Sequence, residues 1–593
     1  MNEPSRRLAA LRAELARGGV DGFVVPRADE YLGEYVPPSG ARLKWLTGFT
    51  GSAGLAIVLP DRAAIFTDGR YVTQVAQQTD PALWERRHVT DEPPAAWLKE
   101  HAAGRRVGYD PWLHPPAMIG RLAASGAELV PLDRNPLDAV WTDRPAEPAA
   151  PAEPWPDRYA GRTAAEKRDL IAAALRAEGQ DAAILSDPHS VAWLLNMRGA
   201  DLRNTPLALG FAVIAADAGV QVFMEPSKAG PALRAALGNA VSFAPRAALP
   251  AALAALSGKT VRVDADATPA WFDRALRAAG ATVVHAADPV RLPRARKTAA
   301  EAEGARAAHR RDGRAMARFL AWFEATAPGG ALTETAVADE LLRFREREDL
   351  FRGESFPAIA GAGENGAVIH YRATPASDRA VRRDEGFLID SGGQYLDGTT
   401  DVTRTLWTGP GPVMAELRDR YTLVLRGMLA LAATRFPEGV AGPHLDAIAR
   451  RPLWEAGLDF DHGTGHGVGA YLSVHEGPAA FSRAAANVPL AEGMILSDEP
   501  GFYLPGAYGI RIENLLLVRP DETVAAKKPW LRFEVLTLAP FDRRLIATET
   551  LIPAERAAVD AYHARVLAEI GPGLDAPEDA ATLAWLRHAC APL

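Results

Sequence analysis

Residues 388–405 read LIDSGGQYLDGTTDVTRT, and this stretch decides how the fold is interpreted. Its apolar start predicts a buried strand that ends at Asp390, and the pair Gly392 and Gly393 predicts a turn. Alternation along the next strand places four side chains on one face: Thr399, Asp401, Thr403 and Thr405. Asp390 and Asp401 are therefore expected to converge from paired strands. Taken alone, they could also be a turn aspartate and a surface aspartate.

Three more candidate metal ligands follow in short strand or turn contexts. His466 lies in HGTGHGVG, Glu499 in LSDEPGFY and Glu513 in GIRIEN. Four carboxylates and one imidazole suit two divalent cations about 3.5–4 Å apart, which can bridge and deprotonate one water. The oxygen-rich set favours hard or borderline ions such as manganese over a thiolate-type zinc site.

Glu499 is the best general-base candidate, because a carboxylate at a strand end can bind a metal and also hold the attacking water. Its neighbour Asp498 points the other way if the strand continues, which indicates a structural role. Arg511 shares a face with Glu513, so it would neutralise the crowded carboxylates and lower their pKa. A routine cross-strand salt bridge would use the same residues, and the two interpretations do not conflict.

Three histidines remain open on local grounds. His462 either supports a metal ligand through a hydrogen bond or is a core histidine whose hydrogen bonds are satisfied. His370, in AVIHYRAT, and His475, in SVHEGP, are core residues or hydrogen-bond donors to a substrate oxyanion. His475 is favoured because it lies nine residues from His466.

Other catalytic classes lack their signatures. HGTGHGVG has no preceding strand, following helix or Lys-Ser/Thr pair for a phosphate loop, and the formal GxGxxG run at 361–366 leads into apolar VIHY. No Gly-x-Ser-x-Gly elbow has a plausible His/Asp pair, HExxH is absent, and the single cysteine, Cys590, falls at the chain end, which we expect to be frayed. Nucleophilic serine or cysteine catalysis and a thermolysin-type site are therefore not expected.

Bulk properties predict a soluble multidomain protein. The 593 residues are 48% hydrophobic and 24% charged, and the net charge of −8 argues against nucleic-acid binding. One cysteine fits a reducing compartment. The N-terminus lacks the apolar core of a signal peptide, and Leu8, Leu11 and Leu15 instead predict a docked amphipathic helix. No apolar run is long enough to predict a transmembrane span.

Composition predicts two boundaries. Six prolines in residues 135–156 indicate an extended connector, and capping boxes begin helices at Thr163 and Thr298, which places a second boundary near residue 295. The first two segments share an order of apolar strands around a Trp-Leu pair, which favours divergent duplication over the runs found in any α/β domain. The tail after Pro553 is expected to be helical and to cover the core or a partner subunit.

The blocks DSGGQYLDGTTDVTRT, HGTGHGVG, VHEGP, DEPGFY and GIRIEN closely resemble the metal-ligand blocks of the pita-bread metallopeptidases. The resemblance is closest to the long, three-domain, cytosolic aminopeptidase P (Xaa-Pro aminopeptidase) family and spans essentially the whole chain. It implies an α/β (α+β) fold with two creatinase-like domains, 1–140 and 157–295, before a pita-bread catalytic domain with a helical C-terminal extension, 296–593.

The same resemblance implies hydrolysis of the N-terminal Xaa-Pro bond of peptides with proline at the second position. It implies two metal ions, typically manganese, and its metal ligands are Asp390, Asp401, His466, Glu499 and Glu513, with Asp401 and Glu513 shared between the ions. The implied catalytic residues are Glu499, His475 and His370, and the implied substrate contacts are Arg70 (in TDGRY), His370, His466 and His475. Arg511 and His462 support the site.

A first-domain contact through Arg70 would place the site at a domain or subunit interface. The resemblance also implies a cytoplasmic homodimer without nucleic-acid or membrane partners. Two alternatives remain, a prolidase-type Xaa-Pro dipeptidase and a catalytically inactive pita-bread peptide-binding module. Chain length argues against the first, and the complete ligand set argues against the second.

Overall fold

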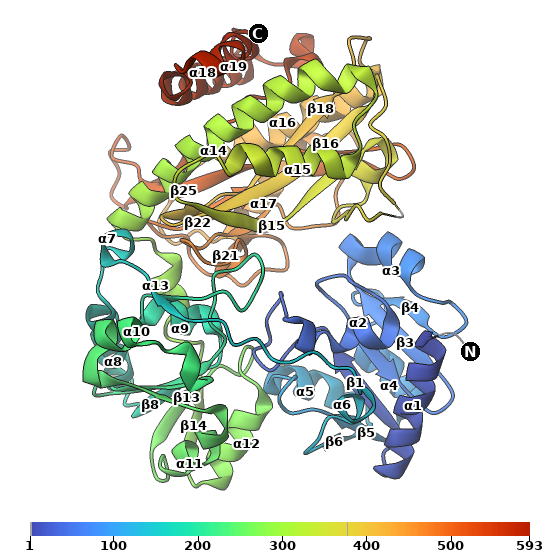
Figure 1. Ribbon diagram of the computed structural model, residues 1–593, viewed down its shortest axis with the longest axis vertical. Helices are drawn as coiled ribbons and strands as arrows, with labels where there is room; N and C mark the ends of the chain where they lie inside the picture. Colours follow the sequence, from blue (N-terminus) through green and yellow to red (C-terminus); the bar gives the residue numbers. More distant parts are fainter. Residues whose placement is uncertain (1–2, 376) are drawn as a thin grey trace. The chain divides into compact units, whose positions relative to one another are not determined.

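The computed structural model describes residues 3–375 and 377–593, which divide into two compact units (Figure 1). Unit 1 takes in the chain up to Asp157 together with Arg162–Arg291, and unit 2 consists of Arg158–Gly161 and Leu292–Leu593. Across the described ranges, no helix has both the length and the apolar character needed to cross a bilayer.

Unit 1 contains two six-stranded sheets of the same topology. The strand orders are β4-β3-β2-β1-β5-β6 and β12-β11-β10-β8-β13-β14. In the first sheet β1 pairs antiparallel with β2 and parallel with β5. In the second sheet β8 pairs in the same way, antiparallel with β10 and parallel with β13. Equal order and equal pairing support the predicted duplication.

The strands of the two sheets are short, and the central strands are more buried than the edge strands β4, β6, β12 and β14. Their bounds are β1 Gly22–Pro26, β2 Leu55–Val58, β3 Ala63–Thr67, β4 Glu85–His88, β5 Arg106–Tyr109, β6 Glu128–Pro131, β8 Ala182–Leu185, β10 Phe211–Ala215, β11 Val220–Phe223, β12 Val241–Ala244, β13 Thr260–Val263 and β14 Thr282–His285. The helices of unit 1 are α1 Glu3–Arg17, α2 Arg42–Thr47, α3 Val72–Gln78, α4 Pro94–Ala102, α5 Pro116–Ala123, α6 Pro136–Val140, α8 Ala164–Ala177, α9 Pro188–Leu194, α10 Pro231–Leu237, α11 Leu249–Ala254 and α12 Ala270–Ala278.

The amphipathic start and the first capping box behave as predicted. Leu8, Leu11 and Leu15 of α1 are buried in the core of the first sheet. Thr163 and Glu166 form a reciprocal capping box at the start of α8.

The segment 135–156 is only partly the extended connector that its prolines predict. Asn135 caps helix α6, and Leu137 of α6 packs into the core with α1. Further on, β7 (Glu153–Pro154) pairs with β9 (Met197–Arg198). A proline at the first helical position favours a helix start, which is why this part of the connector folds.

Unit 2 is built on two main sheets flanked by helices. One holds β15, β16, β17 and β18, the other has the order β19-β26-β25-β22-β20-β21, and β23 and β24 form a hairpin. The strands are β15 Phe351–Ala362, β16 Gly386–Tyr395, β17 Gly398–Thr399, β18 Val402–Trp407, β19 Arg435–Pro437, β20 Gly465–Gly467, β21 Glu476–Phe481, β22 Ile495–Asp498, β23 Gly501–Leu504, β24 Tyr508–Arg511, β25 Asn514–Pro520 and β26 Trp530–Val535. The helices that belong to or lead into this unit are α7 Asp157–Ala160, α13 Arg291–Ala295, α14 Ala299–Thr326, α15 Glu334–Arg345, α16 Ala415–Ala432, α17 Gly442–Glu455, α18 Pro553–Ile570 and α19 Ala580–Ala589. This is the expected α/β pita-bread domain with a helical C-terminal extension.

Alternation along β16 separates a helix-covered face from a polar face. Phe387 and Ile389 pack under α14 and α15, whereas Leu388 packs in a different cluster on the opposite side. Asp390 has the parity of Leu388, so it points away from these helices.

The turn predicted at Gly392 and Gly393 is wrong. β16 runs through both glycines to Tyr395, and pairs with β18 from Gly386 to Ser391. A Cβ on Gly392 would lie 2.0 Å from the Thr400 carbonyl oxygen. The glycine therefore serves a close approach between strands.

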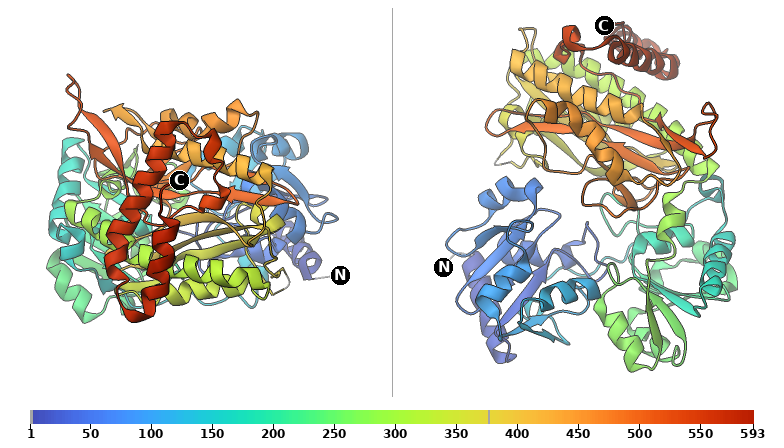
Figure 2. Two further views of the ribbon diagram at one scale, coloured as in Figure 1. Left: turned by 90° about the horizontal axis from the view of Figure 1, so that it is seen from above. Right: turned by 180° about the vertical axis from the view of Figure 1, so that it is seen from behind.

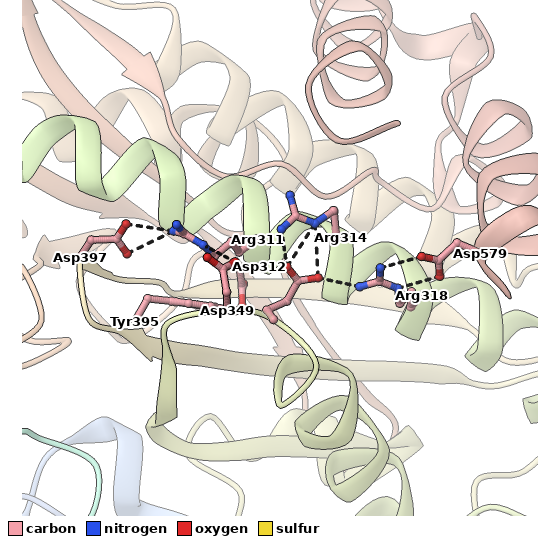
Figure 3. A network of polar contacts seen from close by, with 9 residues as sticks. Arg311, Asp312, Arg314, Arg318, Asp349, Tyr395, Asp397 and Asp579 are labelled. Atoms are coloured by element: carbon pink, nitrogen blue, oxygen red, sulfur yellow. Dashed lines mark hydrogen bonds and ion pairs between the residues drawn. The ribbon is translucent and has the colours of Figure 1, made fainter. Parts of the chain in front are cut away.

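Polar contacts fasten α14 to its surroundings (Figure 3). Arg311 forms an ion pair with Asp397 in the β16–β17 turn, and Asp312 accepts a hydrogen bond from Tyr395 at 3.0 Å. Arg318 pairs with Asp579 at 2.7 Å, just before α19. One helix thus holds both the hairpin between Asp390 and Asp401 and the C-terminal extension.

The tail is helical, as expected, and it covers the core. Val559, Tyr562 and Val566 of α18 join Leu586 of α19 in one apolar cluster with α16. Figure 2 shows the ribbons of these two C-terminal helices, coloured red, side by side. Cys590 is buried in the same cluster, so the expectation of a frayed end is wrong at this residue. Burial raises the pKa of its thiol to about 12, which makes it unreactive.

Candidate metal centre

Asp390 and Asp401 meet through the pairing of β16 and β18. Asp390 lies opposite Thr403, and Asp401 comes directly before β18. Both are buried, with 8% and 4% of their surface exposed. The predicted convergence of the two aspartates is therefore observed.

His466 and Glu499 come from the second sheet. β20, which carries His466, pairs with β22, and Glu499 follows β22 directly. His466 Nε2 lies 3.4 Å from Glu499 Oε1 and 3.6 Å from Asp401 Oδ2. This imidazole therefore joins the carboxylates of the two sheets.

Glu513 completes the group between β24 and β25. Its Oε2 accepts a hydrogen bond from Thr403 Oγ1 at 2.7 Å. Ligand atoms of Asp401, His466 and Glu513 all lie within 4.8 Å of one another. A single cation could contact all three.

Three carboxylate oxygens of the cluster make no hydrogen bond with the described residues. In the part of the chain that the structure describes, Asp390 Oδ1, Asp401 Oδ1 and Glu513 Oε1 are buried and have no hydrogen-bond partner. An unpaired buried carboxylate oxygen costs several kcal/mol unless a proton or a cation compensates it. Oxygen and imidazole donors of this kind fit divalent cations such as manganese.

The pKa values report the same crowding. Burial, followed by repulsion from neighbouring carboxylates, raises the pKa of Asp401 and of Glu513 well above the usual range. Burial also raises the pKa of Glu499 to about 7, although Arg511 opposes the shift. Cations at this position would hold all three ionised.

Arg511 supports the cluster from one side. Its Nη2 donates to Asp390 Oδ2 at 2.6 Å, and its Nη1 donates to the Tyr503 hydroxyl at 2.8 Å. Its Nε reaches Thr403 Oγ1 at 3.3 Å. The predicted support from Arg511 thus extends to two hydroxyl groups that sequence reasoning missed.

His462 belongs to this support. Its Nε2 lies 2.8 Å from the Tyr503 hydroxyl, so a chain of hydrogen bonds runs from His462 through Tyr503 and Arg511 to Asp390. Tyr503 ends the DEPGFY block, four residues after Glu499. Alternation along a strand places Glu499, Gly501 and Tyr503 on one face, and this was the available sequence signal for Tyr503.

His475 and His370 both lie in unit 2, in different surroundings. The ring of His475 packs edge-on against the ring of His466, with centroids 4.2 Å apart. His370 lies between Val368 and Tyr371, which pack with Leu388 on the Asp390 side of β16. Both histidines are half-buried.

Arg70 lies in unit 1, in a 3-10 turn at Gly69–Tyr71. Its guanidinium pairs with Asp68 at 2.7 Å and lies over the Tyr71 ring.

Asp498, the neighbour of Glu499, is fully buried, and neither of its carboxylate oxygens has a hydrogen-bond partner among the described residues. Burial raises the pKa of its carboxyl well above the usual range.

Comparisons with known proteins agree with this geometry. Metallopeptidase family M24 matches residues 303–520, and its C-terminal region matches 529–593. Two creatinase/prolidase N-terminal domains match residues 7–140 and 143–301.

Individual relatives match over the full length. A probable Xaa-Pro aminopeptidase P of Neosartorya fischeri is 38% identical and covers 99% of this chain and 93% of its own. An X-prolyl aminopeptidase structure from Caenorhabditis elegans, described as a cytosolic enzyme with a di-nuclear active site, is 32% identical with a TM-score of 0.94 and covers 100% of both chains.

A solved structure of shorter length shows only the shared fold. The Xaa-Pro dipeptidase from Bacillus anthracis is 23% identical with a TM-score of 0.52 and covers 64% of this chain and 99% of its own. Full-length identity, the order of the matched domains and the ligand cluster together place this chain in the Xaa-Pro aminopeptidase P family of the M24 metallopeptidases.

Proposed function

We propose that this protein is a metal-dependent aminopeptidase that hydrolyses the bond between an N-terminal residue and a following proline. The observation that carries the proposal is the group of buried, unpartnered oxygens on Asp390, Asp401 and Glu513, described above, beside His466 and Glu499. The names of the full-length relatives supply the substrate class.

The proposed cofactor is a pair of divalent cations, with manganese as the preferred metal. Asp390, Asp401, His466, Glu499 and Glu513 would hold them, and Asp401 and Glu513 would be shared. When bound, such a pair lowers the pKa of water and polarises the scissile carbonyl. The di-nuclear site of the C. elegans relative supports the number of ions, and the oxygen-rich donors support the metal type.

Glu499 would move the proton. It accepts a proton from the attacking water and returns it to the proline nitrogen as the C–N bond breaks. Ser497 Oγ donates to Glu499 Oε1 at 3.3 Å and also accepts from the His466 backbone N–H at 2.9 Å. This serine fixes the glutamate relative to the imidazole.

His475 and His370 would hold the substrate oxygen as negative charge develops. An N–H donor fixed beside that oxygen stabilises the charge without reorganisation. The packing of His475 against His466 supports its proximity to the reacting carbonyl.

Proline has no N–H, so specificity for proline needs a pocket for its ring rather than a hydrogen bond. The proposed substrate contact through Arg70 stays a prediction.

A prolidase-type dipeptidase uses the same chemistry and is the second candidate. The dipeptidase of B. anthracis corresponds to 64% of this chain, whereas the aminopeptidase of C. elegans corresponds to all of it. This difference favours the aminopeptidase. A non-catalytic binding module is disfavoured because every expected ligand is present.

Peptide cleavage by the manganese-loaded protein tests the proposal. We expect release of arginine from Arg-Pro-Pro and slow or no cleavage of Gly-Pro. Glu499→Gln should lose several orders of magnitude in kcat, whereas Glu522→Gln, at an exposed turn, should match wild type. Preference for Gly-Pro would favour the dipeptidase, and inactivity on both peptides would favour the binding module.

We also infer a cytosolic homodimer. The cytosolic description of the C. elegans enzyme supports the location. Light scattering on the purified protein would test the dimer, and a monomer at micromolar concentration would contradict it.

A further inference from the structure

A cavity of about 250 Å³ lies on the far side of the β16–β18 sheet from the carboxylate cluster. Leu406 of β18 lines it together with Leu320 and Phe323 of α14. Thr403 and Thr405 have the opposite parity on β18, and they contact Glu513 and Arg511. The cavity is therefore separate from the metal centre.

Apolar side chains form most of the wall, and the acidic groups on it are engaged. Trp585 of α19 donates from its indole nitrogen to Glu324 at 3.0 Å. Asp542 pairs with Arg544 at 2.7 Å. Glu324 also lies 3.8 Å from Arg544, so both acidic side chains of the wall are within ion-pair distance of this one guanidinium.

Arg543 is the second arginine of the wall. Its two Nη atoms donate to backbone carbonyls, to His588 at 3.2 Å and to Pro592 at 2.7 Å. Over the described ranges, no carboxylate lies within ion-pair distance of Arg543, and its buried Nε has no acceptor. The backbone oxygen of Leu593, at the chain end, accepts from Arg556 instead.

A largely apolar cavity that holds one guanidinium without a carboxylate partner fits an amphipathic anion. We propose that this cavity binds a small hydrophobic carboxylate, with its apolar part against Phe323, Leu406 and Trp585 and its carboxylate paired with Arg543. Carboxylates form the strongest hydrogen bonds with arginine. The volume lies just below the roughly 300–1,000 Å³ of drug-sized sites, so the ligand is smaller than a drug.

Arg404 connects this cavity to the metal centre. Its guanidinium lies over the ring of Phe541, a lining residue, at 4.8 Å. Its Nη1 donates to the backbone carbonyl of Glu513 at 2.7 Å, and its Nε donates to Pro540, another lining residue, at 3.2 Å. An occupant that shifts Phe541 therefore acts on a ligand residue, so binding of the carboxylate and binding of metal are expected to be coupled.

Calorimetric titration of the full-length, manganese-loaded protein tests the site with 3-phenylpropionate. Its neutral counterpart 3-phenylpropan-1-ol has the same shape without the charge. We expect the acid to bind at least tenfold more tightly than the alcohol, and Arg543→Gln to remove this difference. Ala589→Trp, which fills the cavity from α19, should abolish binding of both. These readouts do not depend on peptidase activity.

Three results would overturn the site: no binding of either compound, equal affinity for acid and alcohol in wild type, or undiminished binding by Ala589→Trp. The comparison of the two compounds in wild type stands even if a variant fails to fold. Should Ala589→Trp instead change the oligomeric state while wild type binds neither compound, the cavity is an interface between copies. Coupling predicts that the dissociation constant of the acid differs by about fivefold or more between metal-free and manganese-loaded protein. Equal constants would refute the coupling.

Discussion

Arg511 donates a hydrogen bond of 2.6 Å to Asp390, and this contact joins two strands that lie more than a hundred residues apart in sequence. The guanidinium is fully buried and also binds Tyr503. It supplies one permanent positive charge to a cluster of four carboxylates. The remaining negative charge is what the proposed cations would neutralise.

Replacing Arg511 by lysine should weaken metal binding. Lysine keeps the charge, but it cannot contact Asp390, Tyr503 and Thr403 at once. Loss of such outer support costs about 10–100-fold in metal affinity or activity. Manganese titration measures this loss, and affinity equal to wild type would show that the charge alone suffices.

Thr403→Val removes the hydroxyl that orients Glu513. The β-branched shape is kept, so the strand should persist, but Glu513 loses its 2.7 Å donor. We expect kcat/KM to fall by about tenfold, equivalent to about 1.4 kcal/mol. Thr403→Ser should restore most of it, and failure of serine to do so would assign the effect to packing.

The metal-free protein should lose stability as pH rises. Burial raises the pKa of Asp401, Glu499 and Glu513 above their unfolded values, so the folded state binds more protons between pH about 4 and 7. Stability from these groups is present below the unfolded pKa and is lost as pH rises through the folded pKa, about 7 for Glu499.

Thermal unfolding at pH 5 and pH 8, with and without manganese, measures this dependence. Manganese should raise Tm more at pH 8, because protons compete for the same oxygens at pH 5. Glu513→Gln should flatten the dependence of the metal-free protein on pH. A metal-free Tm that falls toward pH 8 as steeply in the variant as in wild type, or a wild-type Tm that rises toward pH 8, would contradict the assignment.

Asp579→Asn should destabilise the C-terminal extension. Asp579 and Arg318 are largely buried, and the substitution removes one of the two carboxylates that pair with the guanidinium, the other being Glu348 at 2.6 Å. Loss of a charge-assisted hydrogen bond costs about 1.5–3 kcal/mol. Glu455→Gln breaks the exposed pair with Arg451 and should cost under about 1 kcal/mol. Equal Tm shifts for the two variants would contradict this ranking.

Gly392→Ala should disrupt the hairpin that carries both aspartates. The new Cβ would meet the Thr400 carbonyl oxygen at 2.0 Å, and that contact is backbone that cannot swing aside. Gly120→Ala is the control, because its Cβ would meet nothing within 4 Å inside helix α5. We expect soluble expression and metal binding to fail only for Gly392→Ala; normal binding by it would mean that the strands relax.

The gathering of Asp401, His466 and Glu513 was predictable because each lies in a short block whose alternation and glycines are visible locally. Asp390, His466 and Glu499 could each be placed at a strand, and their convergence followed from the chemistry they share. The extent of β16 could not be read, since two glycines suggest a turn unless the opposing Thr400 backbone is known. Tyr503 and the burial of Cys590 also depend on contacts with segments far along the chain.

The position of α6 was missed for a similar reason. Prolines in the 135–156 segment suggested an extended chain, while burial of Leu137 against α1 depends on a helix more than a hundred residues earlier. The duplication could be predicted because the two segments show the same order of apolar runs in the sequence, and these runs form two sheets of equal strand order.

The stoichiometry of bound manganese tests the central claim most directly. After dialysis against manganese and removal of free ions, elemental analysis of wild type should find two ions per chain. Asp401→Asn, which alters a ligand proposed to be shared, should retain one or none while its far-ultraviolet circular dichroism stays unchanged. Wild type that binds no metal, or a folded Asp401→Asn variant that still binds two ions, would contradict the account.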